Sequence, residues 1–160
     1  MTLTTEAELV QNPALGALAL WAFTVEYFSQ TQRRRGPALP LVLPVLPMTL
    51  HQETVDSIHN RHFDGGLLLA LADNRTLTLD LQERMEAMMP QTMLALNLGF
   101  ATNLLALDRE SGELRPKRMT PPVRQVQPEV KRMISAAERL GYWFCTMNTD
   151  QLCSYLRIRF

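Results

Sequence analysis

Apolar residues occupy most faces of a helix between positions 12 and 30, which predicts a helix at the centre of the fold. Asn12 is a favourable N-cap and Pro13 suits the first helical position, so the helix is predicted to begin there. Three arginines at 33–35 favour the negative end of the helix dipole, and Gly36-Pro37 is predicted to end the helix.

A second long apolar pattern runs at helical spacing from Pro128 to Met147, and a short final helix is predicted from Thr149 to Leu156. Each long helix contains a glycine, Gly16 or Gly141, at a cost of about 1 kcal/mol relative to alanine. Close packing between helices commonly offsets such a cost. The two ends of the chain are therefore predicted to meet in one core.

The segment from Pro37 to Pro47 alternates prolines with leucines and valines. Four prolines argue against a helix and remove too many N–H donors for a central strand. An extended segment across the core, or an edge strand, is predicted instead. Leu41 and Leu43 are candidates for an exposed docking strand, and a buried connection between helices is the alternative.

Capping-box patterns predict two short helices in the middle of the chain, one from Thr49 to Ile58 and one from Asp80 to Met89. A buried helix is predicted over Leu67–Ala72, after a break at Gly65-Gly66. Pro90 separates the Asp80 helix from another over Gln91–Asn103. The stripe expected to be buried on this last helix consists of Met93, Leu96, Phe100 and Leu104.

Residues 104–115 predict a short hairpin with Gly112 at the left-handed turn position. Helix, turn, helix and hairpin follow one another in the order of a winged helix-turn-helix. The predicted fold class is mostly α (α+β), a winged-helix-like unit framed by packed N- and C-terminal helices. One domain is expected over residues 1–160, with residues 1–11 flexible.

Composition and charge exclude several protein classes. Sixteen basic and sixteen acidic residues cancel, so no global field attracts DNA or anionic lipid. Cys145 and Cys153 are too few for a disulfide framework and fit a reducing compartment. Glu6 and Glu8 stand where a signal peptide would be basic, and no apolar run reaches the ~20 residues that span a bilayer. A soluble, cytoplasmic protein without membrane contact is expected.

No pattern of catalytic or metal-ligating residues emerges. The three histidines, at 51, 59 and 62, fall on a helix end and a loop with no cysteine nearby, so loop or capping roles are favoured over zinc binding. The serines have no nucleophile-elbow context, and no glycine-rich phosphate loop occurs. We expect no enzymatic activity, no metal and no cofactor.

Three segments carry a family resemblance: Asn12-Pro-Ala-Leu-Gly, the leucine–proline run Leu39–Met48, and Ala136-Ala-Glu-Arg-Leu-Gly followed by Trp143-Phe144. In this order they resemble the middle component of bacterial three-component ABC systems, and most closely the small LmuC-type subunit of Lamassu anti-phage defence. The resemblance covers residues 10–160. It implies a non-catalytic adaptor between an SMC-like ABC ATPase, which engages DNA, and an effector subunit that is often a nuclease.

A free-standing winged-helix DNA-binding regulator is the alternative. The candidate recognition helix, Gln91–Asn103, contains no lysine or arginine. Phosphate contacts supply much of the affinity for DNA, so this helix favours packing or protein docking over groove binding.

Charge is nevertheless unevenly distributed. From Leu50 to Pro90, seven acidic and three basic residues give a net charge of −4, whereas from Arg115 to Arg139 seven basic and two acidic residues give +5. Residues 115–127 are predicted to be an extended basic segment stiffened by prolines. Together with the resemblance, this favours a two-sided adaptor over ordinary solvated faces. The candidate partner-binding residues are Arg33, Arg34, Arg35, Leu41, Leu43, Arg115, Lys117, Arg118 and Arg124.

Overall fold

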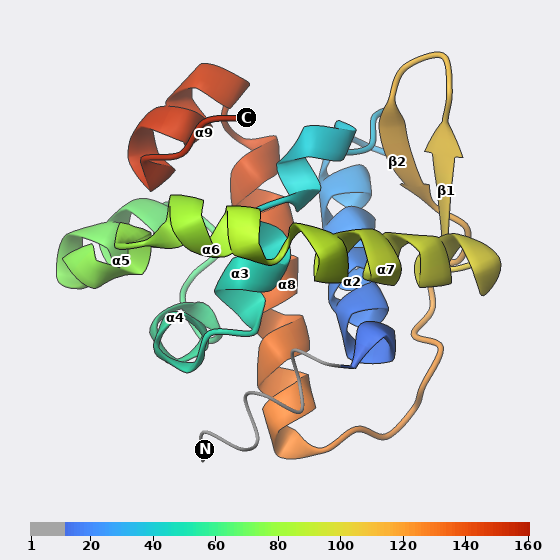
Figure 1. Cartoon of the computed structure of the whole chain (residues 1–160), viewed down its shortest axis with the longest axis horizontal. Helices are drawn as coiled ribbons and strands as arrows, with labels where there is room; N and C mark the ends of the chain where they lie inside the picture. The colour runs from blue at the N-terminus through green and yellow to red at the C-terminus, as the bar shows by residue number, and fades with distance from the viewer. Residues whose placement is uncertain (1–11) are drawn as a thin grey trace.

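The computed structural model describes residues 12–160, so the expected flexibility of residues 1–11 lies outside the described part of the chain. Two long helices, α2 (Pro13–Gln30) and α8 (Pro128–Cys145), pack against each other at the centre (Figure 1). Shorter elements surround this pair: η1 (Leu39–Val42), α3 (Val45–Thr49), α4 (Gln52–Ile58), α5 (Gly66–Asp73), η2 (Arg75–Thr78), α6 (Leu81–Ala87), α7 (Met89–Ala101), β1 (Leu105–Asp108), β2 (Glu113–Pro116) and α9 (Thr149–Leu156). The predicted class, mostly helical with one short hairpin, is confirmed.

The two chain ends meet as predicted. A Cβ atom at Gly141 would lie 2.4 Å from the carbonyl oxygen of Phe23, and one at Gly16 would lie 2.9 Å from Cβ of Ala95. Glycine is therefore required at both crossings, α8 on α2 and α2 on α7. At the α2–α8 interface, Phe23 and Phe144 pack edge to face with ring centroids 5.4 Å apart.

Helix α2 begins as predicted, since the Asn12 side chain accepts hydrogen bonds from the N–H groups of Ala14 and Leu15. It ends at Gln30, not at Gly36-Pro37. The hydroxyl of Thr31 donates to the carbonyl oxygen of Phe28, and Arg33 takes a φ of 61°, so the chain leaves the helix axis. The prediction that the three arginines lie at the helix end is therefore wrong.

The proline–leucine segment is helical, not extended. Pro40 occupies the first turn of η1, and Pro47 lies in the first turn of α3, where a backbone N–H would have no helical partner. The sequence pattern misled because Pro40, Pro44 and Pro47 fall at helix starts. Residues 41, 42 and 44–50 are buried, as the alternative of a buried connection requires.

The predicted helices of the middle segment exist, but their capping boxes do not. Thr49 lies in α3 and its hydroxyl donates to Val45, while His51 precedes α4. Asp80 precedes α6 in the left-handed region, with a φ of 56°, and its side chain makes no cap hydrogen bond. The residues of both capping-box motifs are present, but neither Thr49 nor Asp80 caps the free N–H groups at the start of the following helix.

The loop between α4 and α5 is fastened to α8. The indole N–H of Trp143 donates to the carbonyl oxygen of Phe63 at 2.7 Å, and the hydroxyl of Tyr142 donates to the carboxylate of Asp64. This hydrogen bond raises the pKa of the Tyr142 hydroxyl. Gly66 begins α5 directly against the Trp143 ring. Helix α5 is thereby held at one end of the molecule (Figure 1).

The winged-helix arrangement is not confirmed. Only Met88 separates α6 from α7, whereas a helix-turn-helix uses a turn of roughly three to four residues. Helices α6 and α7 run one after the other across the front of the molecule, and the hairpin of β1 and β2 stands at one side (Figure 1). Its turn contains Gly112 with a φ of 71°, as predicted.

The predicted stripe of α7 is confirmed in part, since Leu96 and Leu104 are buried and Phe100 is half-buried. Thr92, Ala95, Leu96 and Gly99 are buried, whereas Met93 is exposed. Small residues point inward because α2 crosses α7 closely. The outward face therefore carries apolar and uncharged side chains. No helix among residues 12–160 is long and apolar enough to cross a membrane.

Candidate partner interface

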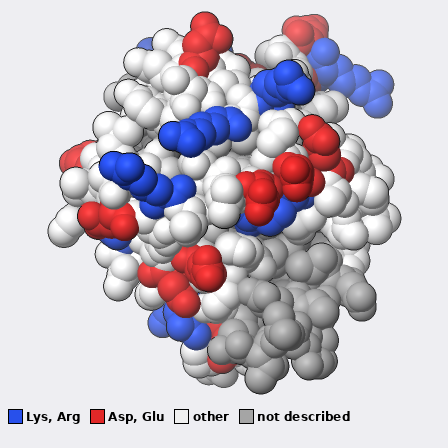
Figure 2. Space-filling view, turned by 60° about the vertical axis from the view of Figure 1, so that its left-hand side comes forward, with Lys and Arg blue, Asp and Glu red and all other residues white. Residues whose placement is uncertain are grey.

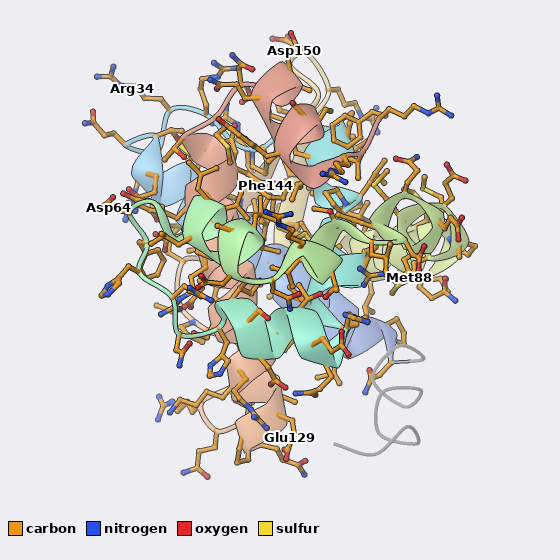
Figure 3. The ribbon with its side chains drawn as sticks, turned by 90° about the vertical axis from the view of Figure 1, so that its left-hand side faces the viewer. Arg34, Asp64, Met88, Glu129, Phe144 and Asp150 are labelled. Carbon is orange, nitrogen blue, oxygen red and sulfur yellow. The ribbon has the colours of Figure 1, made fainter. Side chains whose placement is uncertain are left out.

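The arginines at 33–35 follow the end of α2, and one of them is tied to the hairpin. The guanidinium Nε of Arg35 lies 3.3 Å from the Glu113 carboxylate, which also accepts the backbone N–H of Gly36 at 3.1 Å. Arg33 and Arg34 are exposed, and Arg34 extends away from the body of the molecule (Figure 3).

Arg115 lies in β2 and not in the extended segment. It contacts the Glu113 carboxylate at 3.5 Å and the Asp108 carboxylate at 3.7 Å, and its guanidinium carbon lies 5.7 Å from the Phe28 ring centre. Backbone N–H groups of the hairpin turn lower the pKa of Asp108, so that carboxylate stays charged. The structure thus brings Arg35 and Arg115 together and largely neutralises both.

Leu41 and Leu43 lie apart from these arginines. Leu41 is buried in the core and Leu43 is half-buried against it. Both positions agree better with the buried connection than with a docking strand.

The connector, residues 117–127, carries the remaining predicted cations. Lys117 donates from Nζ to Asn103 at 3.1 Å, and the Arg118 guanidinium donates to Thr120 and to the carbonyl oxygen of Pro121. Arg124 is exposed. These contacts leave the positive charges without a carboxylate partner among the ion pairs of residues 12–160.

A groove of about 520 Å³ lies between the connector and the helices. Apolar side chains from three helices and the connector line most of it: Leu15, Leu18, Leu98, Leu104, Val123, Val126 and Val130. The indole N–H of Trp21 donates to the carbonyl oxygen of Arg118 at 2.9 Å and holds the start of the connector. Sequence reasoning missed this groove because its lining comes from segments far apart in the chain.

Helix α5 presents a second surface that sequence reasoning missed. Leu68 and Leu69, expected to be buried, are 48% and 55% exposed, and nearby Leu79 is 62% exposed. Charged side chains of both signs intermingle over the face that includes this end of the molecule (Figure 2). The acidic excess of residues 50–90 therefore does not form a uniform negative patch on that face.

His51, His59 and the two cysteines contact other parts of the fold. His51 Nδ1 lies 3.0 Å from the Thr54 hydroxyl, and the carbonyl of His59 accepts from Ser135. Cys145 and Cys153 are half-buried free thiols, and burial raises the pKa of both. Between residues 12 and 160, no three metal-ligating side chains gather.

Exposed apolar surfaces on a small helical domain are typical of proteins that bind other proteins. Over residues 1–160 the chain matches the family described as ABC-three component (ABC-3C) system Middle Component 3. It therefore belongs to this family, the middle components of three-component ABC systems. Comparisons with curated proteins and with solved structures gave no match.

Proposed function

We propose that this middle component is a non-catalytic adaptor that bridges an SMC-like ABC ATPase and an effector subunit, often a nuclease. Family membership supports a place in an assembly with ABC components. The resemblance to the LmuC-type subunit supports a cytoplasmic, Lamassu-like defence system against phages or plasmids. In this assignment the ATPase contacts DNA, and the adaptor is linked to DNA only indirectly, through the complex.

The observation that carries the proposal is the presence of two separate surfaces of different chemistry. The α5 surface, made of Leu68, Leu69 and Leu79, is apolar. The connector, with its three cations and apolar groove, lies on the opposite side of the molecule from α5 (Figure 1). A bridging protein must contact two partners at once, so it needs surfaces that do not overlap.

Direct DNA binding is the weaker explanation. Helix α7 carries no cation, and Arg35 and Arg115 already contact Glu113. Helix α7 and these two arginines therefore offer little to phosphate, and contacts with phosphate supply much of the affinity for DNA.

Co-expression with the ATPase and effector encoded beside it tests the proposal. The tagged protein should retain both partners, and Leu68→Glu with Leu69→Glu should release one of them while the other stays bound. Tyr155→Glu is the matched control, because Tyr155 is an exposed apolar side chain on α9, apart from both surfaces. Recovery of neither partner would refute the adaptor role, and a salt-resistant nanomolar complex with DNA would favour the regulator.

A further inference from the structure

The groove beside the connector is an open apolar surface of substantial size. Its volume of about 520 Å³ falls within the range of roughly 300–1,000 Å³ typical of binding clefts. Val123 on the connector wall is 50% exposed, and Leu15, Leu98 and Val130 on the helices are half-buried. Covering these side chains would remove apolar area from water, the main source of binding free energy.

The charge around the groove has one sign. Arg118 is the charged residue among those that line it, and the connector contains three basic and no acidic residues. The two cations with assigned hydrogen bonds, Lys117 and Arg118, bond neutral oxygens rather than carboxylates. Lys117 also donates its backbone N–H to Leu104, which places it at the end of the groove. A complementary partner must therefore combine apolar side chains with carboxylates.

The connector is stiff and has a hollow on each side. A second hollow, of about 250 Å³, lies on its other side, and Leu18, Val123 and Val126 line both hollows. Pro121 and Pro122 restrict the backbone of the connector. A stiff segment loses little conformational entropy when a partner binds to it.

We propose that this groove is the docking site for an amphipathic acidic segment of another component of the ABC-three component complex. Its apolar side chains enter between α2, α7 and the connector, and its carboxylates face Lys117, Arg118 and Arg124. This inference rests on the proposed adaptor role and assigns one of its two surfaces a partner chemistry. Nucleic acid fits less well, because the groove is lined mainly by aliphatic side chains that cannot bond phosphate.

Binding measurements on the co-expressed ATPase and effector, each purified, test the charge requirement. Arg118→Glu with Arg124→Glu should weaken binding of one partner by about tenfold or more, and added salt should weaken binding of the wild-type protein. Val123→Asp should have a similar effect through the apolar contact. Arg109→Glu with Arg159→Glu is the matched control, because both arginines are exposed and lie outside the groove and outside helix α5 and η2. Wild-type affinity in both groove variants would overturn the proposal.

Photo-crosslinking identifies the occupant directly. A benzophenone side chain at position 123 in the assembled complex should crosslink to a partner peptide rich in Leu, Ile or Val and in Asp or Glu. Crosslinks to a second copy of this chain, to nucleic acid or to a basic peptide would each overturn the assignment. If wild-type protein recovers neither partner, the adaptor role itself fails; if it recovers both and only the groove tests fail, the adaptor role stands.

Discussion

Replacing Gly141 by alanine tests whether the α2–α8 crossing determines the stability of this fold. The new Cβ would lie 2.4 Å from the carbonyl oxygen of Phe23 and 3.1 Å from Cβ of Glu26. The carbonyl belongs to the backbone of a buried helix and cannot rotate away, so the two helices must separate locally. A gap of about 0.5–1 Å already forfeits a quarter to a half of the dispersion attraction between facing atoms.

Two opposing effects set the magnitude. Alanine gains about 1 kcal/mol over glycine in helix propensity. Overpacking a core costs about 1–3 kcal/mol, and contact with a backbone atom belongs at the upper end of that range. We therefore expect Gly141→Ala to lose about 2 kcal/mol net, which corresponds to a fall in Tm of roughly 4–8 °C for a chain of this size. Gly141→Leu should lose more.

Gly99→Ala is the matched control. Gly99 is also buried inside a helix, but a Cβ atom there would first meet Cδ1 of Leu105 at 3.0 Å, the flexible end of a side chain. Here the propensity gain should balance or exceed the packing cost. Urea unfolding followed by the fluorescence of the two buried tryptophans, Trp21 and Trp143, measures both variants. If Gly141→Ala is as stable as wild type, the close crossing of α2 and α8 is wrong.

Three further outcomes are expected. Glu113→Ala should destabilise the protein by about 1–3 kcal/mol in urea unfolding, because the buried N–H of Gly36 loses its acceptor, whereas the exposed Arg35→Ala should change stability by less than about 1 kcal/mol. Burial, and secondarily the Glu26 carboxylate, raises the pKa of Glu138 above its ordinary value of 4.5, so the folded protein binds this proton more tightly than the unfolded chain and loses stability as pH rises above 4.5. Glu138→Gln should therefore melt higher than wild type at pH 7, and the difference should shrink as pH falls toward 4.5; a constant difference would contradict this. Mobility shift of the isolated protein at physiological salt should detect no DNA complex tighter than micromolar.

The central helices could be predicted from the sequence because their signals are local and strong. The Asn12-Pro13 start and the glycines at 16 and 141 each indicated a feature that the structure contains. The end of α2 could not be predicted, since the turn depends on Thr31 and on the distant contact between Arg35 and Glu113. The prolines at 37–47 predicted an extended segment, but most residues from Leu41 onward are buried, and short helices pair their backbone groups there.

The candidate interface was predictable in part. The basic character of residues 117–127 is visible in the sequence, whereas the groove requires α2, α7 and α8 to meet beside them. Periodicity could not tell that small residues such as Ala95 and Gly99 join Leu96 on the buried face of α7, while Met93 and Leu94 stay exposed. Helix α2 approaches α7 so closely at Gly16 and Ala95 that only small side chains fit between the two helices.

Pairing of α2 with α8 has a consequence for synthesis of the protein. Helix α2 ends at Gln30 and its main partner begins at Pro128, so about 100 residues must be added before that partner starts to emerge. At ~5–20 residues per second, the apolar helix α2 stays on the ribosome for roughly 5–20 s before α8 can pack against it. During that interval its exposed leucines and aromatic rings are open to chaperones and to other nascent chains. A message that slows translation before residue 128 would lengthen this exposure and lower the yield of folded protein.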